Sequence, residues 1–118
     1  MSNSYEKAHP FEKRSKDSEN IRKRYPDRIP VVVLQDKKDS LPKLNRSKYL
    51  VPMDLTLGQF IYVLRKRLVL QGSDALFVYI NNTLVPTSHA MEQIFNEHRS
   101  SDGFLYLTIA GENAFGSI

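Results

Sequence analysis

The sequence of 118 residues contains no cysteine and no tryptophan. Without cysteine, the chain cannot form a disulfide, bind zinc through thiolates or attack a substrate with a thiol. For the same reason it cannot carry a thioester on one of its own side chains, and it offers no site for prenylation or palmitoylation. Any thiol chemistry in which this protein takes part must therefore be supplied by other proteins.

Long apolar runs and targeting signals are also missing from the sequence. No apolar stretch approaches the roughly 20 residues that a transmembrane helix needs. The segment 1–6 has no apolar region of the kind found in signal peptides, and Ser2 stands where N-myristoylation requires glycine. These features predict a cytoplasmic protein.

The net charge of +4 is distributed unevenly, because residues 1–28 hold eight Lys or Arg against five Asp or Glu. An unbroken run of cations would indicate nucleic-acid binding, but Glu12, Asp17 and Glu19 interrupt the basic residues, which is typical of a solvated helix face. The triplet 65–67 closes a predicted helix, where cations offset the helix dipole. We expect no nucleic-acid partner.

No pattern of catalytic or metal-binding residues is present. His9, His89 and His98 are not spaced as ligands of one metal ion, and the sequence contains no serine-hydrolase, zinc-protease or paired-carboxylate motif. The segment Gly111–Gly116 has the two glycines of a phosphate loop, but it lacks the lysine and the following helix. The sequence therefore predicts a protein that is not an enzyme and that needs no metal or cofactor.

Two helices and four strands are predicted behind a charged N-terminal helix over residues 10–25. A capping box at Thr56 and Gln59 opens an amphipathic helix over 57–68, and a second, short helix is expected to begin near Ser88 and to end near Arg99. Strands are expected at 28–35, 48–51, 76–80 and 104–109. This order predicts an α+β domain with a mixed sheet, for which both a β-grasp and a ferredoxin-like arrangement remain open.

Three local features bear on interactions. The strand at 48–51 is short and ends at Pro52, which favours an exposed edge that a partner strand could extend; the alternative is a strand buried on both faces. Pro30 indicates an edge strand or the start of a strand. Near the C-terminus, Gly116 follows Phe115, and this glycine provides either simple flexibility or a reactive end that an enzyme can enclose.

These features occur together with several longer runs of sequence. They are Pro10-Phe11-Glu12-Lys13-Arg14, Arg28-Ile29-Pro30-Val31, Lys48-Tyr49-Leu50-Val51-Pro52, Gly58-Gln59-Phe60, Asp102-Gly103-Phe104-Leu105-Tyr106 and Gly111-Glu112-Asn113. From about residue 5 to Gly116 the chain resembles the autophagy ubiquitin-like modifiers of GABARAP type. The resemblance implies a ubiquitin-like β-grasp with a four-stranded mixed sheet behind two N-terminal helices. It divides the chain into a helical extension (1–27), a core (28–110) and a tail (111–118).

The resemblance also implies a function. A cysteine protease would cut between Gly116 and Ser117, and E1-like and E2-like enzymes would then pass the Gly116 carboxylate to phosphatidylethanolamine. The protein, a monomer in solution, would move from the cytoplasm to autophagosomes and to membranes directed to the vacuole or lysosome. There it would recruit receptors that carry aromatic-x-x-Leu/Ile/Val motifs. The alternative is a soluble trafficking or cytoskeletal adaptor of the same fold that is never conjugated.

The implied peptide site has two pockets and two flanking arginines, Arg28 and Arg67. The backbone from Lys48 to Leu50 would pair with the bound peptide as an added strand. A second docking face would lie near Phe77, Val78 and Tyr79. The aromatic pocket would be lined by Asp17, Ile21, Pro30, Lys48, Leu50 and Phe104, and the aliphatic pocket by Tyr49, Val51, Pro52, Leu55, Phe60 and Val63.

Overall fold

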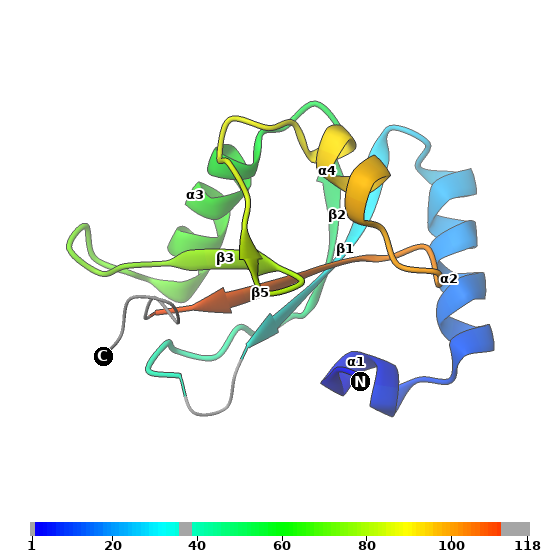
Figure 1. The fold of residues 1–118 in the computed structure, drawn as a ribbon, viewed down its shortest axis with the longest axis horizontal. Coiled ribbons are helices and arrows are strands. Elements are labelled where there is room, and N and C mark those ends of the chain that lie inside the picture. Colours follow the sequence, from blue (N-terminus) through cyan, green and yellow to red (C-terminus); the bar gives the residue numbers. More distant parts are fainter. Residues whose placement is uncertain (1, 36–38, 112–118) are drawn as a thin grey trace.

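The computed structural model describes residues 2–35 and 39–111. The described helices are α1 (Ser4–Ala8), α2 (Phe11–Arg24), α3 (Leu57–Leu68) and α4 (Met91–His98). The strands are β1 (Arg28–Gln35), β2 (Lys48–Pro52), β3 (Phe77–Ile80), β4 (Thr83–Leu84) and β5 (Leu105–Ala110). Figure 1 shows α3 and α4 on one face of the sheet and α1 on the other, with α2 at the end of the sheet where β5 begins.

One mixed sheet has the strand order β2-β1-β5-β3-β4. Its central strands β1 and β5 run parallel, with Val31 opposite Leu105, and the other pairs are antiparallel. The predicted ubiquitin-like β-grasp is therefore confirmed, although the sheet has five strands rather than the four expected. Within the part of the chain that the structure describes, no helix combines the length and apolar character needed to cross a membrane.

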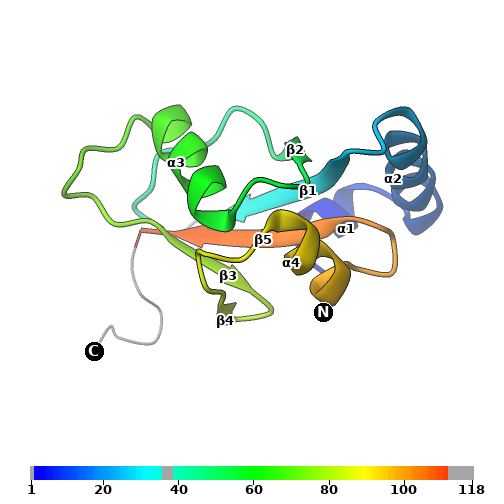
Figure 2. The ribbon, with the colours of Figure 1, turned by 90° about the horizontal axis from the view of Figure 1, so that it is seen from above.

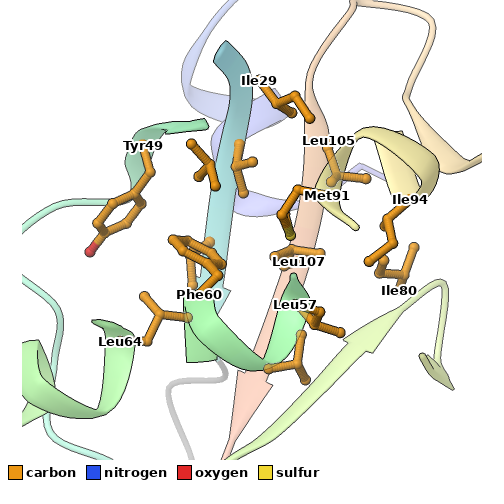
Figure 3. Packing of buried hydrophobic residues seen from close by; sticks show 14 of the residues in the cluster. Ile29, Tyr49, Leu57, Phe60, Leu64, Ile80, Met91, Ile94, Leu105 and Leu107 are labelled. Carbon is orange, nitrogen blue, oxygen red and sulfur yellow. The ribbon is translucent and has the colours of Figure 1, made fainter. Parts of the chain in front are cut away.

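The core lies between the sheet and helices α3 and α4 (Figures 2 and 3). Strand β5 alternates strictly, so that Leu105, Leu107 and Ile109 are fully buried while the residues between them are half-buried. Leu57, Phe60, Leu64 and Leu68 contribute one face of α3 to this cluster. The periodicities of 2 and 3.6 residues thus place the two apolar faces against each other.

Helix α3 begins as the sequence predicts. The Thr56 hydroxyl accepts a hydrogen bond from the Gln59 N–H at 3.2 Å, and the Gln59 side chain accepts one from the Thr56 N–H at 2.9 Å. This reciprocal pairing satisfies two N–H groups that the start of a helix would otherwise leave unpaired. Fixing the start of α3 fixes the positions of the side chains one and two turns later, which line the site described below.

Three details differ from the sequence prediction. Of the two alternatives for Pro30, the edge strand is wrong, because β1 has neighbours on both sides; Pro30 instead lies near the start of β1, before the pairing with β5 begins at Val31. Helix α4 begins at Met91 rather than Ser88. Asn81 and Asn82 form a turn with positive φ angles, 51° and 63°, which asparagine tolerates, and this turn leads into the short strand β4, which was not predicted.

The end of α3 holds a β-branched residue in a left-handed conformation. Val69, the C-cap, has φ 57° and ψ 44°, and its side chain is 78% exposed. A non-glycine residue pays roughly 1–2 kcal/mol for this backbone geometry, and valine gains little contact in return. We expect Val69→Gly to raise the free energy of unfolding by about 0.5–1 kcal/mol, measured by urea denaturation. Val69→Ala, which keeps the strain, is the matched control and should gain clearly less.

A buried polar network attaches α2 to the turn before β5. The Arg14 guanidinium donates to the Asp102 carboxylate at 3.0 Å, and the same carboxylate accepts from the Tyr106 hydroxyl at 2.5 Å and from the Phe104 N–H at 2.9 Å. Arg14 and Asp102 are both buried. Burial and the bond to Asp102 raise the pKa of Tyr106 well above its ordinary value.

The same turn makes a close approach to α2. The Ser18 hydroxyl donates to the Asp102 carbonyl. Gly103, with φ 91°, faces Ser18 so closely that a Cβ atom at this position would collide with its side chain. The turn and α2 therefore sit at a fixed distance, and α2 is held beside the sheet although its buried residues, Arg14 and Ser18, are polar.

Candidate functional site

A groove of about 670 Å³ follows the exposed edge of the sheet at β2. It lies between α2 and α3, with β2 as its floor. Its lining is formed by Ile21, Arg28, Arg46, Lys48, Tyr49, Leu50, Val51, Pro52, Leu55, Phe60, Val63 and Arg67. This set, named here the edge groove, combines apolar side chains with four cations.

The alternation of β2 divides the edge groove into two sides. Tyr49 and Val51 are buried toward the core beside α3, while Lys48, Leu50 and Pro52 are half-buried on the other face of the strand. The first side is completed from α3 and the second from α2, through Ile21. The edge groove can therefore accept two side chains of an extended ligand, one on each side of the strand.

The free edge of β2 can be assigned from the strand register. The Val33 N–H donates to the Ser47 carbonyl at 2.7 Å, and Pro30, opposite Leu50, has no N–H to donate. Since hydrogen-bonded and non-hydrogen-bonded pairs alternate in an antiparallel ladder, Lys48 and Leu50 direct their backbone groups away from β1. The Arg28 guanidinium reaches the Leu50 carbonyl at 3.4 Å. An extended peptide could pair with this edge once Arg28 moves aside.

Positive charge surrounds the edge groove. Lys48 lies 3.9 Å from Asp17, but among the described residues no ion pair involves Arg28, Arg46 or Arg67. The Arg67 guanidinium instead lies 5.7 Å from the centroid of the Tyr49 ring, a cation–π contact. The charge around the rim therefore favours a ligand that places acidic groups beside its apolar side chains.

Tyr49 belongs to both the core and the edge groove. Its ring meets Phe60 edge-on at 5.7 Å between centroids, and its hydroxyl is buried with no hydrogen-bond partner (Figure 3). Burial raises its pKa, while Arg67 and then Arg46 oppose that shift. Replacing Tyr49 would therefore change stability as well as the surface of the groove.

Most of the peptide-site residues predicted from the resemblance line the edge groove, and three do not. Asp17 reaches it only through its ion pair with Lys48. Pro30 and Phe104 are buried, Phe104 completely, with its ring 5.8 Å from that of Tyr5. Neither of these two residues lines the edge groove. The sequence prediction missed Arg46, since a lone arginine in a polar loop gives no signal until the fold places it beside β2.

The predicted second docking face is less exposed than the edge groove. Val78 is 4% and Tyr79 6% exposed, and Val78 belongs to the core cluster. Only Phe77 is half-buried, so the free protein presents little of this predicted face. The predicted cleavage and conjugation residues, Gly116 and Ser117, lie outside the described residues.

Comparison with known families decides the identity of the chain. The family model described as "Autophagy protein Atg8 ubiquitin like" matches residues 13–116. The chain belongs to the Atg8 family. Autophagy-related protein 8 of Vanderwaltozyma polyspora is 47% identical over 118 residues, which is 100% of both chains. The resemblance to autophagy ubiquitin-like modifiers is thereby confirmed.

Two solved Atg8 structures share the fold. The crystal structure of Trypanosoma brucei ATG8 superposes with a TM-score of 0.89 at 43% identity, covering 98% of this chain and 100% of that one. Plasmodium falciparum Atg8, solved in complex with a Plasmodium falciparum Atg3 peptide, gives a TM-score of 0.85 at 28% identity, covering 95% of this chain and 98% of that one. This Atg8 chain is therefore an autophagy-related ubiquitin-like modifier by family and by fold.

Proposed function

We propose that this protein is conjugated through Gly116 to phosphatidylethanolamine and that its edge groove then recruits autophagy receptors to the membrane. The observation that carries the recruiting half is the edge groove itself, with an unpaired strand edge, an apolar side on each face of β2 and a cationic rim. Its ligand is an extended segment with an aromatic residue, an aliphatic residue three positions later and acidic neighbours.

Each part of that ligand has a counterpart in the groove. The aromatic side chain enters on the side of Ile21 and Leu50, and the aliphatic one on the side of Phe60 and Val63. The peptide backbone pairs with Lys48 and Leu50, and its acidic residues face the arginines of the rim. Because residues i and i+2 of a strand point to the same face, a separation of three places the two anchors on opposite sides of β2.

The conjugating half rests on family membership. The protein has no cysteine, so the thioesters that activate Gly116 would form on E1-like and E2-like enzymes, after a cysteine protease had removed Ser117 and Ile118. The Atg3 peptide bound to the Plasmodium relative supports an Atg3-type conjugating enzyme as a partner. The protein acts as a modifier and not as an enzyme, and it moves from the cytoplasm to autophagosome membranes.

Leu50→Ala tests the edge groove. We expect it to weaken binding of an aromatic-x-x-Leu peptide by about 2 kcal/mol, roughly 30-fold in dissociation constant by calorimetry, because Leu50 is a central apolar contact on the free edge. Tyr49 is avoided because it also supports the core.

Leu84→Ala is the control for this experiment, since Leu84 is a half-exposed leucine on β4 at the far edge of the sheet. It should leave peptide affinity unchanged. If Leu50→Ala and the wild type bound the peptide equally well, docking along β2 would be wrong.

A further inference from the structure

A second groove lies on the other side of α2, between this helix and the turn that joins α4 to β5. Figures 1 and 2 both show the turn passing beside α2. The groove has a volume of about 420 Å³. It is lined by Ser15, Ser18, Glu19, Arg22, Phe95, Arg99, Ser100, Ser101, Asp102 and Gly103. We name it the turn groove, and no residue that lines it also lines the edge groove.

Two arginines from distant parts of the chain meet on one aromatic ring in this groove. The guanidinium of Arg22, on α2, lies 4.8 Å from the centroid of Phe95, and that of Arg99, just after α4, lies 5.6 Å from it. Phe95 is 2% exposed, so its position is set by the core. The ring therefore gathers two exposed cations at a fixed place.

The charge of these arginines is not neutralised by the protein. Among the described residues, neither Arg22 nor Arg99 takes part in an ion pair. Glu19 pairs with Lys23 at 3.0 Å, and the Asp102 carboxylate is buried and already bonded to Arg14 and Tyr106. Both acidic residues of the lining have other partners. The two positive charges of Arg22 and Arg99 therefore remain in the groove, where a bound anion would neutralise them.

The donor groups of the groove match a phosphate monoester. Each guanidinium presents a planar fork of N–H donors that fits two phosphate oxygens. The hydroxyls of Ser100 and Ser101 add donors from a turn that is fixed by its own hydrogen bonds, Ser100 N–H to Phe104 carbonyl at 2.8 Å and Gly103 N–H to Ser100 carbonyl at 2.9 Å. A phosphate monoester carries between about one and a half and two negative charges at neutral pH, close to the charge of the two arginines.

We propose that the turn groove binds a phosphate monoester presented by a phosphorylated serine or threonine of a partner protein. Strand β5 starts beside this groove and runs away from it toward Ala110 (Figure 1). A molecule held to a membrane by its C-terminus therefore turns the groove away from that membrane, toward soluble partners. The assignment of the phosphate to a soluble partner rests on the proposed conjugation, whereas the binding of a phosphate monoester does not.

The test uses the full unconjugated chain, labelled with ¹⁵N and titrated at constant ionic strength. The probe is acetyl-Gly-phosphoserine-Gly-amide, compared with its unphosphorylated form and with inorganic phosphate. We expect a dissociation constant on the order of millimolar for the phosphopeptide, with amide shifts around Arg22, Phe95 and Ser100 to Gly103. Arg22→Gln and Arg99→Gln should each weaken binding about tenfold, and the double variant should abolish it.

Arg24→Gln is the matched control, because it removes one arginine from the same helix outside the turn groove, and among the described residues Arg24 takes part in no ion pair. It should leave the affinity within twofold. Arg99→Lys keeps the charge but loses the fork, and it should fall between the wild type and Arg99→Gln. Equal shifts with the unphosphorylated peptide would overturn the proposal. The proposal would also be overturned if Arg24→Gln weakened binding as much as Arg22→Gln, or if the double variant kept full affinity with an unchanged melting temperature.

A second experiment distinguishes a phosphorylated protein from a phosphorylated lipid as the source of the phosphate. Phosphatidylcholine vesicles with and without phosphatidylinositol 4-phosphate are sedimented with the same protein, and we expect no binding that depends on Arg22 and Arg99. Vesicle binding stronger than phosphopeptide binding and lost in the double variant would overturn the assignment to a protein partner. That assignment would also be overturned if the protein bound inorganic phosphate but did not bind the phosphopeptide. Because the protein in these assays is unconjugated, failure of the proposed conjugation at Gly116 would be seen separately.

Discussion

Gly116→Ala should abolish attachment of the protein to phosphatidylethanolamine while leaving peptide binding in the edge groove unchanged. The proposed reaction passes the terminal carboxylate through enclosed enzyme sites, and glycine is the residue that lets another protein close around the backbone. In cell extract, the wild-type chain should lose the mass of Ser117 and Ile118 and then yield a lipidated band on gels. The variant should yield no lipidated band.

Gly72→Ala is the control for this experiment. A Cβ atom at Gly72 meets no atom within 4 Å, so the substitution adds the same methyl group without disturbing the fold. It should be processed and lipidated like the wild type. A lipidated band from Gly116→Ala would remove the assignment of this residue, and a wild-type chain that is never lipidated would favour the unconjugated adaptor of the same fold.

Asp102→Ala should lower the free energy of unfolding by about 3–5 kcal/mol, measured by chemical denaturation. The substitution leaves the buried Arg14 guanidinium without its closest carboxylate, and it removes the acceptor for the Tyr106 hydroxyl and the Phe104 N–H. Breaking one side of a buried ion pair costs this much because the remaining charge stays buried. Glu6, 3.7 Å from the same guanidinium, is too distant to replace Asp102 fully.

Glu19→Ala provides the comparison for an exposed pair, since Glu19 and Lys23 are both well over half exposed. It should change stability by less than about 1 kcal/mol. The Asp102 variant should also weaken peptide binding in the edge groove, because α2 contributes Ile21 to that groove and is held in place through Arg14. A loss of stability below about 1 kcal/mol for Asp102→Ala would show that α2 is held by other contacts.

Several elements follow from the sequence because their cause is local. The helix at 57–68 is predicted by Thr56 and Gln59, which pair within one turn, and by an apolar stripe. That stripe can be recognised from the sequence without knowing which element packs against it. The turn at Asn81 and Asn82 depends on the tolerance of asparagine for positive φ angles. The predicted helix over 10–25 ends where Pro26 prevents continuation, close to the observed end at Arg24.

Other elements do not follow from the sequence because their cause lies far along the chain. Strand β4 is two exposed residues that become a strand only by pairing with Tyr79 and Ile80. Pro30 was compatible with an edge strand or with the start of a strand, and only the sheet order shows that it lies near the start of a strand with neighbours on both sides. The charge of residues 1–28 gave no hint that Arg14 is buried against a carboxylate 88 residues away.

The absence of cysteine and the apolar periodicities were properties of the sequence alone, and they were sufficient to exclude thiol chemistry and to predict an α+β domain. The resemblance then narrowed the function to a modifier with a reactive glycine. Only the tertiary structure decided which side chains share a surface. In the folded protein Arg46 lines the edge groove, whereas Phe104 and Val78 are buried. Arg22 and Arg99 both contact the ring of Phe95. The physical reason is that periodicity fixes which face of an element is apolar, whereas the neighbours of that face are set by long-range packing.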